Sequence, residues 1–437
     1  MNFASLARLE SLSVRGMRLG LEAIDALCER LGRPERSFPS VLVGGTNGKG
    51  STAATLSAIA LACGRRTGLY TSPHLIAATE RVRVGAEDAP VEALDGALAK
   101  AFAAAGRAPE IPLTYFEAIT AAAFLLFRDA RVELGILEVG LGGRFDATNV
   151  APAALSIVTS IGLDHMAELG PTREAIAREK AGIFRRGRPA LVSADDPLAL
   201  GALGDAAAAA GAELHDAARE ISVRRISTGL RGTSFEIATP RMEASLETPL
   251  AGAHQAWNAA LAIRGAELIP GALGPLSAET AARALSAVRW PGRLERLALP
   301  GGRGVLLDGC HNPDGAHALA GFLDDAGLAG LCPLVFGAMA DKDVEGIAAP
   351  LFPKVSEVVL VAAAPPRGAS PEELLRRTAA FARKARTAPD ARAALARLAA
   401  EPEGPTGAPI IVAGSLYLVG EARAAILAGG TDGEGRP

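Results

Sequence analysis

Hydrophobic residues in the first 290 positions recur at two spacings. Continuous apolar runs at 41–43, 134–139 and 155–160, with a shorter one ending at Tyr70, predict buried strands. Apolar residues at helical spacing predict helices at 5–32 (with a glycine-bracketed break at 16–20), 116–128, 172–184, 254–268 and 277–288. Strands that alternate with helices at this pace form a parallel sheet with helices on both faces.

The pattern changes between residues 221 and 250. Polar and apolar residues alternate there, as in 233–237, which predicts a small antiparallel excursion with one face in water. The segment 290–293 (Trp-Pro-Gly-Arg) predicts a domain boundary, because strands at 305–307, 334–336, 358–361 and 410–412 then alternate with helices again. We expect two α/β domains, 1–290 and 291–428, and a disordered tail at 429–437, which lacks core-forming residues.

Composition narrows the class of protein. The chain has 437 residues, of which 49% are hydrophobic and 21% charged, so it is globular and long enough for two or three domains. A net charge of −3 gives no electrostatic reason to expect a nucleic-acid partner. The four cysteines lack metal-type spacing, no apolar run is long enough to cross a membrane, and the N-terminus lacks a signal-peptide pattern. We therefore expect a cytoplasmic protein with reduced thiols and no membrane partner.

The segment Gly45-Thr46-Asn47-Gly48-Lys49-Gly50-Ser51-Thr52 lies between the strand at 41–43 and a predicted helix at 53–63. Small residues allow the backbone N–H groups to face an anion, and the following helix adds its positive end. Lys49 can reach the outer phosphates of a nucleotide, and Ser51 or Thr52 can offer a hydroxyl to Mg²⁺. Gly50 separates the lysine from the hydroxyl residue, which departs from the standard P-loop. The segment still predicts a phosphate-binding loop rather than a plain turn.

Two further residues follow predicted strands and could bind a metal ion. Glu138 stands near the end of the strand at 134–139, and His165 follows the strand at 155–160 beside Asp164. The carboxyl ends of parallel strands meet at the ligand crevice, where a carboxylate is a suitable Mg²⁺ ligand. The alternatives are that Glu138 caps the glycine-rich turn after it and that His165 is structural. The sequence leaves both pairs of interpretations open.

Lys180 lies within the predicted helix at 172–184. Its neighbours three and four positions away are Ile176, Ala177, Ile183 and Phe184, which places the amine on the apolar stripe of the helix. Burial lowers the pKa of a lysine and yields a neutral, nucleophilic amine. The alternative is a lysine that covers the edge of the core and extends its charged end to water.

Three turns of the second predicted domain contain polar side chains after strands. They are Asp308-Gly309-Cys310-His311-Asn312-Pro313, Asp341-Lys342-Asp343 and Gly414-Ser415-Leu416-Tyr417. Each could be an ordinary solvated turn. Because they follow strands of one sheet, we expect them on one rim, with Asp308 and His311 pointing into a cleft between the domains.

Together these segments resemble the folylpolyglutamate synthase/dihydrofolate synthase family of Mur-type ATP-dependent amide ligases. The matching blocks occur in family order from residue 45 to 417. They are 45–51, 71–75, 114–117, 138–149, 161–165, 179–183, 254–255 with Asn258, 290–295, 308–313, 341–343 and 414–417. The resemblance implies an α/β fold with an N-terminal P-loop-type ATPase domain, a C-terminal Rossmann-like domain, and the active site between them.

The resemblance also implies roles for individual residues. Asn47, Gly48, Lys49, Gly50 and Ser51 would bind the ATP phosphates, and Asn258, Arg293 and Asp308 would hold the rest of the nucleotide. Ser51, Ser72, Glu138 and His165 would bind Mg²⁺, and a monovalent cation such as K⁺ is a further possible cofactor. Lys49, Lys180, His165 and His311 would be catalytic, with Lys180 carbamylated by CO₂. Thr114, Tyr115, Phe116, Glu117, Phe145, Asp146 and Ala147 would form the pterin side of the substrate site, to which 17–20 could contribute.

Two places depart from the family pattern: Cys310 stands where alanine is usual, and 84–88 lacks the usual Asn-Gly turn. The implied reaction joins L-glutamate to dihydropteroate, to the γ-carboxylate of reduced folate polyglutamates, or to both, through an acyl phosphate that ATP supplies. The resemblance also implies a monomer that binds only small molecules. One alternative is a Mur ligase that adds an amino acid to a UDP-muramyl peptide, and another is an ATP-binding switch that catalyses no ligation.

Overall fold

The computed structural model describes residues 3–13, 18, 20–269, 271, 273–363, 367–401 and 407–429. An eight-stranded sheet forms the centre of the N-terminal part, in the order β4-β3-β2-β5-β1-β6-β7-β8. Its strands are β1 (Ser40–Gly44), β2 (Thr67–Tyr70), β3 (Val82–Val84), β4 (Glu87–Asp88), β5 (Leu134–Glu138), β6 (Ala153–Val158), β7 (Pro189–Val192) and β8 (Glu213–Asp216). All neighbours from β2 to β8 pair in parallel, and β3 and β4 add an antiparallel edge.

Helices cover both faces of this sheet, as the two spacings of hydrophobic residues predict. On one face lie α1 (Ala4–Ser11), α2 (Glu22–Arg30), α4 (Val91–Ala105), α5 (Tyr115–Asp129), α7 (Arg173–Lys180) and α8 (Pro197–Ala210). On the other lie α3 (Lys49–Ala62), α10 (Ala253–Leu268) and α11 (Ala278–Ser286). In β1 the side chain of Leu42 joins the first core, and those of Val41 and Val43 join the second. Both faces of the central strand are therefore buried, which accounts for its unbroken apolar run.

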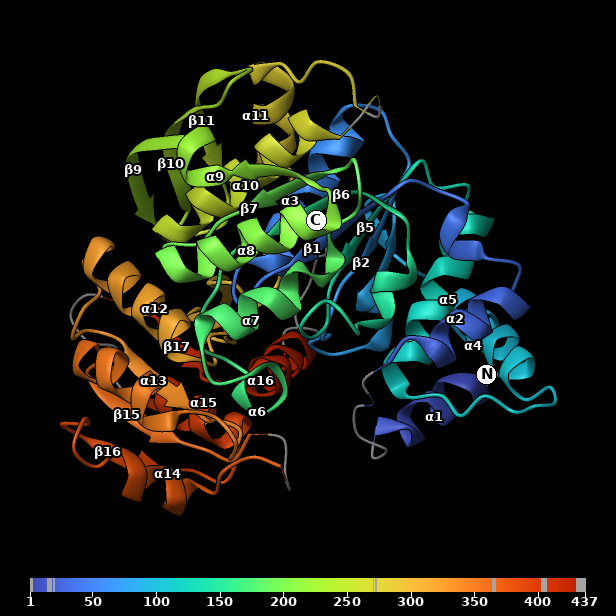
Figure 1. The fold of residues 1–437 in the computed structure, drawn as a ribbon. Helices are drawn as coiled ribbons and strands as arrows, with labels where there is room; N and C mark the ends of the chain where they lie inside the picture. Colours follow the sequence, from blue (N-terminus) through green and yellow to red (C-terminus); the bar gives the residue numbers. More distant parts are fainter. Residues whose placement is uncertain are drawn as a thin grey trace.

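The predicted antiparallel excursion is present as a three-stranded sheet, β11-β10-β9. Its strands are β9 (Ser222–Gly229), β10 (Gly232–Ala238) and β11 (Glu243–Thr248). Buried and half-buried residues alternate along β10, and Phe235 and Ile237 join the core around α3, α10 and α11. One face of this sheet thus packs on the domain, and Figure 1 shows it beside α10 and α11.

The C-terminal part contains a six-stranded sheet in the order β12-β13-β17-β14-β15-β16. Its strands are β12 (Glu295–Ala298), β13 (Gly304–Asp308), β14 (Pro333–Phe336), β15 (Glu357–Leu360), β16 (Ala385–Thr387) and β17 (Ile410–Ala413). The helices are α12 (Pro313–Asp325), α13 (Val344–Leu351), α14 (Pro371–Thr378), α15 (Ala391–Ala400) and α16 (Leu416–Gly429). Only β12, at the edge, is antiparallel to its neighbour, so the predicted second α/β fold is confirmed. In Figure 1 this part is drawn in orange and red, and its helix α16 faces the N-terminal part.

Several boundaries differ from those expected. The helix after the phosphate loop begins at Lys49 and not at residue 53, because glycine and hydroxyl residues already form its first turn. The helix expected at 172–184 ends at Lys180 and continues as a 3₁₀ turn, Ala181–Ile183. Gly429 belongs to α16, and the rest of the expected tail lies outside the described residues. The α4 and α8 helices were not predicted. The alanine-rich sequence of α8 lacks a clear apolar stripe. In α4 the buried Leu94, Leu98 and Phe102 do follow helical spacing, so this helix could have been found.

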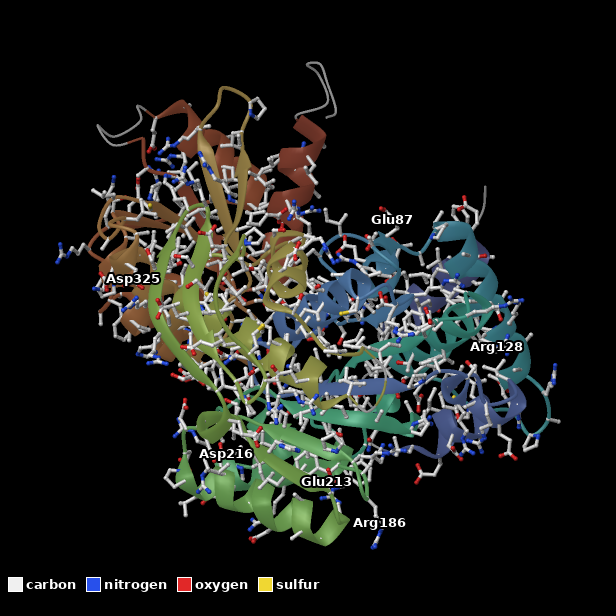
Figure 2. All side chains as sticks on the ribbon, turned by 90° about the horizontal axis from the view of Figure 1, so that it is seen from above. Glu87, Arg128, Arg186, Glu213, Asp216 and Asp325 are labelled. Carbon is white, nitrogen blue, oxygen red and sulfur yellow. The ribbon has the colours of Figure 1, made fainter. Side chains whose placement is uncertain are left out.

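The two parts meet closely at the linker and where α16 touches the segment after β2. The linker passes through Gly292 and Leu294, both with positive φ, and the N–H of Gly309 donates to the carbonyl of Gly292. A Cβ at Gly420 of α16 would lie 2.0 Å from the carbonyl oxygen of Leu75, so the backbones touch there. Charged side chains such as Arg128, Arg186 and Asp325 lie at the periphery (Figure 2). In the part of the chain that the structure describes, no helix is long and apolar enough to cross a membrane.

Candidate active site

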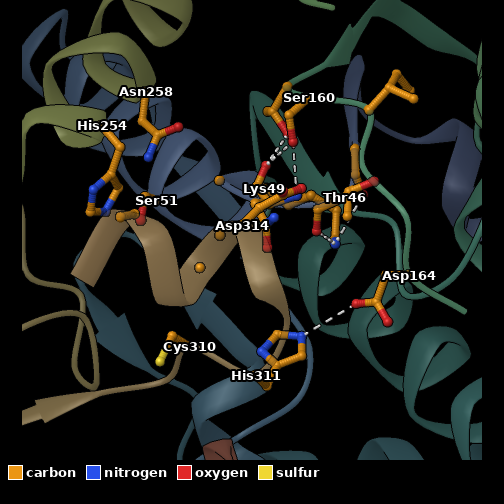
Figure 3. Close-up of a pocket in the computed structure, with 18 of the residues that line it drawn as sticks. Thr46, Lys49, Ser51, Ser160, Asp164, His254, Asn258, Cys310, His311 and Asp314 are labelled. Carbon is orange, nitrogen blue, oxygen red and sulfur yellow. Dashed lines mark hydrogen bonds and ion pairs between the residues drawn. The ribbon is translucent and has the colours of Figure 1, made fainter. Parts of the chain in front are cut away.

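A cavity of about 790 Å³ opens between the two parts of the molecule. Its walls come from the phosphate loop, the ends of β2, β5 and β6, the first turn of α10, and the β13–α12 connection. Every residue expected to be catalytic, to hold the nucleotide or to bind metal lines it: Asn47, Gly48, Lys49, Gly50, Ser51, Ser72, Glu138, His165, Lys180, Asn258, Arg293, Asp308 and His311. Figure 3 shows several of these side chains converging on the cavity.

The phosphate loop is shaped by glycines at which a larger residue would force a neighbour to move. Gly48 adopts φ +83°, and a Cβ there would lie 2.4 Å from Oδ1 of Asn258. A Cβ at Gly50 would lie 2.5 Å from the Trp290 ring. The loop therefore packs directly against α10 and the domain boundary, and its free side faces the cavity. This cradle, together with the N-terminus of the 14-residue helix α3, fits the phosphates of a nucleotide.

Lys49 lies at the start of α3 and folds back over the loop. Its Nζ donates to the carbonyl oxygens of Gly45 and Thr46, both at 3.1 Å. Burial lowers its pKa, and the carboxylates of Glu138 and Asp164 oppose that shift. A cation that is held by carbonyl oxygens and stripped of water can exchange these weak acceptors for phosphate oxygens.

Two of the expected metal ligands, Glu138 and Ser72, meet at the end of β5. The Glu138 carboxylate is 5% exposed and accepts a hydrogen bond of 3.1 Å from the N–H of Ser72. Burial raises its pKa, and Lys49 lowers it. His165 has φ +52°, and burial lowers the pKa of its ring, so the imidazole is a neutral donor at neutral pH.

The side chains expected to bind metal suit Mg²⁺ better than a metal ion whose ligands all come from the protein. Among the described residues, no group of three or more histidine, cysteine, aspartate or glutamate side chains could enclose a metal ion. Mg²⁺ is usually bound by one or two carboxylates, and water and phosphate oxygens complete its shell. One carboxylate (Glu138), one imidazole (His165) and the nearby hydroxyls of Ser51 and Ser72 suit an ion that arrives with a nucleotide.

Lys180 is buried, as its apolar neighbours predict. The side chain is 5% exposed, and Nζ donates a hydrogen bond of 2.8 Å to the carbonyl oxygen of Gly45. Burial, with a further contribution from Lys49, lowers the pKa of Lys180 to about 7. The alternative of an amine extended into water is wrong, and about half of these amines are neutral at pH 7.

The residues expected to hold the rest of the nucleotide approach from both sides. On α10, the amide of Asn258 donates to Oε1 of Gln255 and faces the phosphate loop. Asp308, at the end of β13, accepts hydrogen bonds from the N–H groups of Leu294 and Cys310. Its carboxylate thus also fixes the linker against the second sheet. Cys310 is buried, and burial raises the pKa of its thiol well above the usual value, so it is an unreactive neighbour of His311.

His311 points across the cleft toward the N-terminal part, as expected. Its Nδ1 lies 2.9 Å from the Gly309 carbonyl oxygen, and its Nε2 lies 3.7 Å from Oδ2 of Asp164. Burial lowers the pKa of His311 to about 4, so the ring is neutral at pH 7. Nδ1 must then hold the proton that reaches Gly309, and Nε2 has a free lone pair facing the cleft.

The residues expected on the pterin side lie outside this cavity's walls. Thr114 caps α5, and its N–H and hydroxyl both donate to the Glu117 carboxylate at 2.8 Å. Glu117 is buried and also accepts from Arg18. The Tyr115 ring lies under the Arg81 guanidinium, and the Phe116 ring is 5.9 Å from that of Tyr70. Of the segment 17–20, residues 17 and 19 lie outside the described residues.

The second part of that expected site packs next to the first. A Cβ at Gly140 would lie 2.7 Å from the Phe116 ring, which brings α5 against the turn after β5. Asp146 is buried and accepts from the N–H groups of Gly140, Leu141 and Thr148. Phe145 is 44% exposed, and Ala147 is buried. Asp146 therefore holds the turn beside Glu138, and Phe145 is the member of this segment that is free to meet a ligand.

The structure also reveals contacts that sequence reasoning missed. Asp164, Asn312 and Lys342 come from three different connections and meet at the cleft. All three had been placed in candidate turns, but nothing in the sequence indicated that they touch. In the 84–88 segment, Gly85 itself adopts φ +68° between β3 and β4, so the hairpin forms without an Asn-Gly pair.

Comparison with known proteins agrees with this architecture. Residues 43–266 match the Mur ligase middle domain, and residues 292–416 match the Mur ligase glutamate ligase domain. The dihydrofolate synthase/folylpolyglutamate synthase of Escherichia coli (strain K12) is 37% identical over 370 residues, covering 85% of this chain and 84% of that protein.

Two solved structures extend the similarity to the whole fold. A Mycobacterium tuberculosis folylpolyglutamate synthase complexed with ADP superimposes with a TM-score of 0.88 at 32% identity, covering 97% of this chain and 98% of that one. A bifunctional folylpolyglutamate synthase/dihydrofolate synthase from Yersinia pestis, complexed with AMPPNP and Mn, has a TM-score of 0.83 at 34% identity over 98% of both chains. The chain therefore belongs to the folylpolyglutamate synthase/dihydrofolate synthase family of Mur ligases.

Proposed function

We propose that this protein joins L-glutamate to dihydropteroate and to the γ-carboxylate of reduced folates, using ATP and Mg²⁺. Membership of the family makes the chain an ATP-dependent ligase and favours a folate over the UDP-muramyl peptide left open by the sequence. The observation that supports the proposal best is the cavity that joins Lys49, Lys180 and His311, because it places a phosphate loop opposite the second domain.

In the proposed reaction, the folate carboxylate attacks the γ-phosphorus of ATP, and ADP leaves. The amine of glutamate then attacks the acyl carbon, the C–O bond to phosphate breaks, and one amine proton is lost as the amide forms. Lys49 would neutralise charge on the transferred phosphoryl oxygens. Mg²⁺, held by Ser51, Ser72, Glu138 and His165, would supply further charge neutralisation. The second domain would exclude water, which otherwise hydrolyses the acyl phosphate.

Lys180 has a separate part in this proposal. Only a neutral amine adds to CO₂, and the burial of Lys180 beside Lys49 favours the neutral form. The resulting carbamate would add an anionic group between Lys49 and the metal ligands. His311, with Nε2 facing the cleft, would accept a hydrogen bond from the incoming glutamate amine.

The substrate is proposed to reach the cleft from the side of α5. Thr114, Tyr115, Phe116 and Glu117 pack beside the turn that contains Phe145, Asp146 and Ala147, next to Glu138. This neighbourhood supports a pterin site whose attached carboxylate extends into the cavity. We further propose a cytoplasmic monomer with the domain boundary at residues 290–291. The four free thiols, Cys28, Cys63, Cys310 and Cys332, support a reducing compartment, and chromatography with light scattering tests the monomer.

The decisive experiment measures phosphate release from Mg-ATP and L-glutamate with dihydropteroate in one reaction and tetrahydrofolate in another. Release in both is expected and would establish both activities. Phosphate release with tetrahydrofolate alone would show that the enzyme adds glutamate only to reduced folates and not to dihydropteroate. If neither folate gives phosphate release but a UDP-muramyl substrate does, the Mur ligase alternative replaces the proposal. Release of ADP that does not depend on glutamate would instead support an ATP-binding switch.

A further inference from the structure

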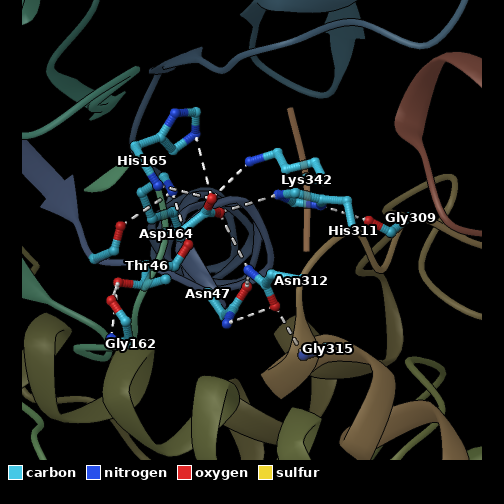
Figure 4. A network of polar contacts seen from close by, with 12 residues as sticks. Thr46, Asn47, Gly162, Asp164, His165, Gly309, His311, Asn312, Gly315 and Lys342 are labelled. Carbon is cyan, nitrogen blue, oxygen red and sulfur yellow. Dashed lines mark hydrogen bonds and ion pairs between the residues drawn. The ribbon is translucent and has the colours of Figure 1, made fainter. Parts of the chain in front are cut away.

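The carboxylate of Asp164 is the point where the second domain meets the region of the phosphate loop (Figure 4). Its Oδ1 lies 2.6 Å from Nζ of Lys342. Its Oδ2 accepts from the amide of Asn312 at 3.3 Å and lies 3.7 Å from Nε2 of His311. Three side chains of one domain thus converge on one side chain of the other. Since Asp164 is 10% and Lys342 13% exposed, water screens their attraction only in part.

The segment that contains Asp164 is fastened to the phosphate loop. The N–H of Thr46 donates to the Ser160 carbonyl oxygen, and the N–H of Asn47 donates to the Ser160 hydroxyl, both at 2.9 Å. The Thr46 hydroxyl also accepts from the N–H of Gly162. The position of Asp164 is therefore coupled to that of the loop through one backbone hydrogen bond and two short hydroxyl side chains.

Asn312 makes a second connection at the same place. Its Oδ1 accepts from the N–H of Gly315 and caps α12, which orients the side chain. Its Nδ2 then reaches both Oδ2 of Asp164 and, at 3.0 Å, Oδ1 of Asn47 in the phosphate loop. The Asp164 carboxylate therefore adds to the direct contact between Asn312 and Asn47 in docking the N-terminus of α12 on the loop.

Lys342 depends on Asp164 for its position. Within the described ranges it forms an ion pair with no other carboxylate. The β14–α13 connection that contains it is held from behind, where Arg377 donates to its backbone carbonyl and pairs with Glu345 at 2.6 Å. Loss of the Asp164 charge would leave the ammonium free to turn away from the cleft, although the connection itself would stay folded.

We propose that Asp164 is a positioning residue for the ligation reaction. It holds Lys342 and Asn312 of the second domain against the phosphate loop, beside His311, so that the groups from both domains are assembled before the amide forms. This inference rests on the proposed function for its kinetic consequence. The proposal makes different predictions for two properties. Loss of the Asp164 carboxylate should hardly change the affinity of the N-terminal domain for the nucleotide. It should strongly reduce the rate of ligation, which depends on groups from both domains.

The kinetic test compares Asp164→Asn, Lys342→Met and the double variant. In Asp164 the N–H of His165 donates to Oδ1 at 2.9 Å, and the amide oxygen of Asn can accept the same hydrogen bond. The Asp164→Asn substitution therefore removes the charge and keeps this contact. We expect kcat for phosphate release with a folate and glutamate to fall on the order of 100-fold, because misplacement of about 1 Å has that effect. The Kd for ATP, measured by calorimetry, should change less than about threefold. The double variant should lose no more than the worse single variant, because both changes break one contact.

The control removes an ion pair that lies within the second domain and away from the cleft. Asp324→Asn breaks the pair with Lys354, which is 2.7 Å long, and should leave kcat and Kd unchanged. Asp164 would lose its assigned role if Asp164→Asn kept kcat within about threefold of the wild type. Losses that add up in the double variant, or a fall in ATP affinity as large as the fall in kcat, would also overturn the proposal, because the defect would then lie in the loop itself.

A second measurement does not depend on the substrate. Small-angle scattering of the Mg-ADP complex should give a larger radius of gyration for Asp164→Asn than for the wild type and Asp324→Asn. Equal radii would refute the docking role. Because this comparison needs only the nucleotide, it tests Asp164 even in a protein that releases no phosphate with either folate, so failure of the proposed function and failure of this inference are distinguishable.

Discussion

Lys49 and Lys180 share one hydrogen-bond acceptor. Both amines donate to the carbonyl oxygen of Gly45, at 3.1 and 2.8 Å; Lys180 is buried, and Lys49 is half-buried. The charge of Lys49 disfavours a second ammonium group so close to it and helps to lower the pKa of Lys180. Conversion of Lys180 into an anionic carbamate would replace that repulsion by attraction and leave Lys49 fully charged for the phosphates.

Replacement of Lys180 should therefore abolish activity without unfolding the protein. We expect Lys180→Ala to reduce kcat on the order of 100-fold or more, because it removes both the anion and its effect on Lys49. The melting temperature should not fall, since a poorly solvated amine is lost. Steady-state kinetics and circular dichroism measure the two effects, and Lys100→Ala, a change on the exposed surface, is the control. Full activity of the Lys180 variant at ordinary CO₂ would rule out the carbamate.

The pKa of Lys180 predicts how activity depends on pH. Above pH 7 the amine is mostly neutral and can add CO₂, and below it the amine is protonated. At limiting CO₂, kcat should fall as pH decreases through about 7, and added bicarbonate should oppose the fall. His311, whose pKa is near 4, should not contribute to this transition. A profile that bicarbonate leaves unchanged would contradict the assignment.

The same shift affects stability. Between the folded pKa of about 7 and the ordinary value of 10.5, the unfolded chain binds a proton that folded Lys180 lacks. The contribution of Lys180 to the free energy of unfolding therefore rises with pH across that window and is constant below it. Urea titrations at pH 7 and 9 should show this rise in the wild type and a smaller one in Lys180→Met, provided that CO₂ is excluded.

Lys49→Ala should eliminate turnover while the fold persists. The amine contacts only two loop carbonyls within the described chain, so its loss removes the charge that faces the phosphates and little packing. We expect no phosphate release above background and a melting temperature close to that of the wild type. Lys354→Ala, which breaks an exposed pair with Asp324, serves as the control. An active Lys49 variant would refute the phosphate-loop assignment.

Gly50→Ala should weaken nucleotide binding through a steric effect. The added methyl would meet the Trp290 ring at 2.5 Å, so either the ring or the first turn of α3 must move. ATP affinity, measured by calorimetry, should fall by about tenfold or more, which corresponds to about 1.4 kcal/mol. Trp290→Leu in the same chain should restore part of the loss. If the second change restores nothing, the contact with the ring is not the cause.

A buried charge cluster away from the cleft provides a test of stability alone. Arg264 pairs with Glu267 at 3.0 Å and Glu220 at 2.8 Å, and the side chains of Arg264 and Glu267 are 7% and 2% exposed. Glu267→Ala should lower the free energy of unfolding by about 3–5 kcal/mol, because it removes one partner of a buried pair. Glu133→Ala, at an exposed pair, should change it by less than about 1 kcal/mol in a urea titration.

The sequence by itself determined the local features of this protein. The apolar run of β1 predicts a strand buried on both faces, and Asn47-Gly48-Lys49-Gly50-Ser51 predicts a phosphate loop, because backbone curvature and charge there depend only on neighbouring residues. Lys180 could also be placed on an apolar helix face. Strand order in the sheets and the alanine-rich helix α8 could not be derived, since pairing and packing depend on distant residues.

Only the tertiary structure decided which of these features act together. Asp164 and Lys342 are 178 positions apart, and their contact depends on how two sheets face each other across the linker at residues 290–294. Similarly, Glu117 and Asp146 could be predicted as parts of a substrate site, but their hydrogen bonds show that each also holds a turn or helix end in place. The sequence around a residue indicates which chemical group is present and in which local structure. Only the distances in the folded protein show which other residues that group contacts.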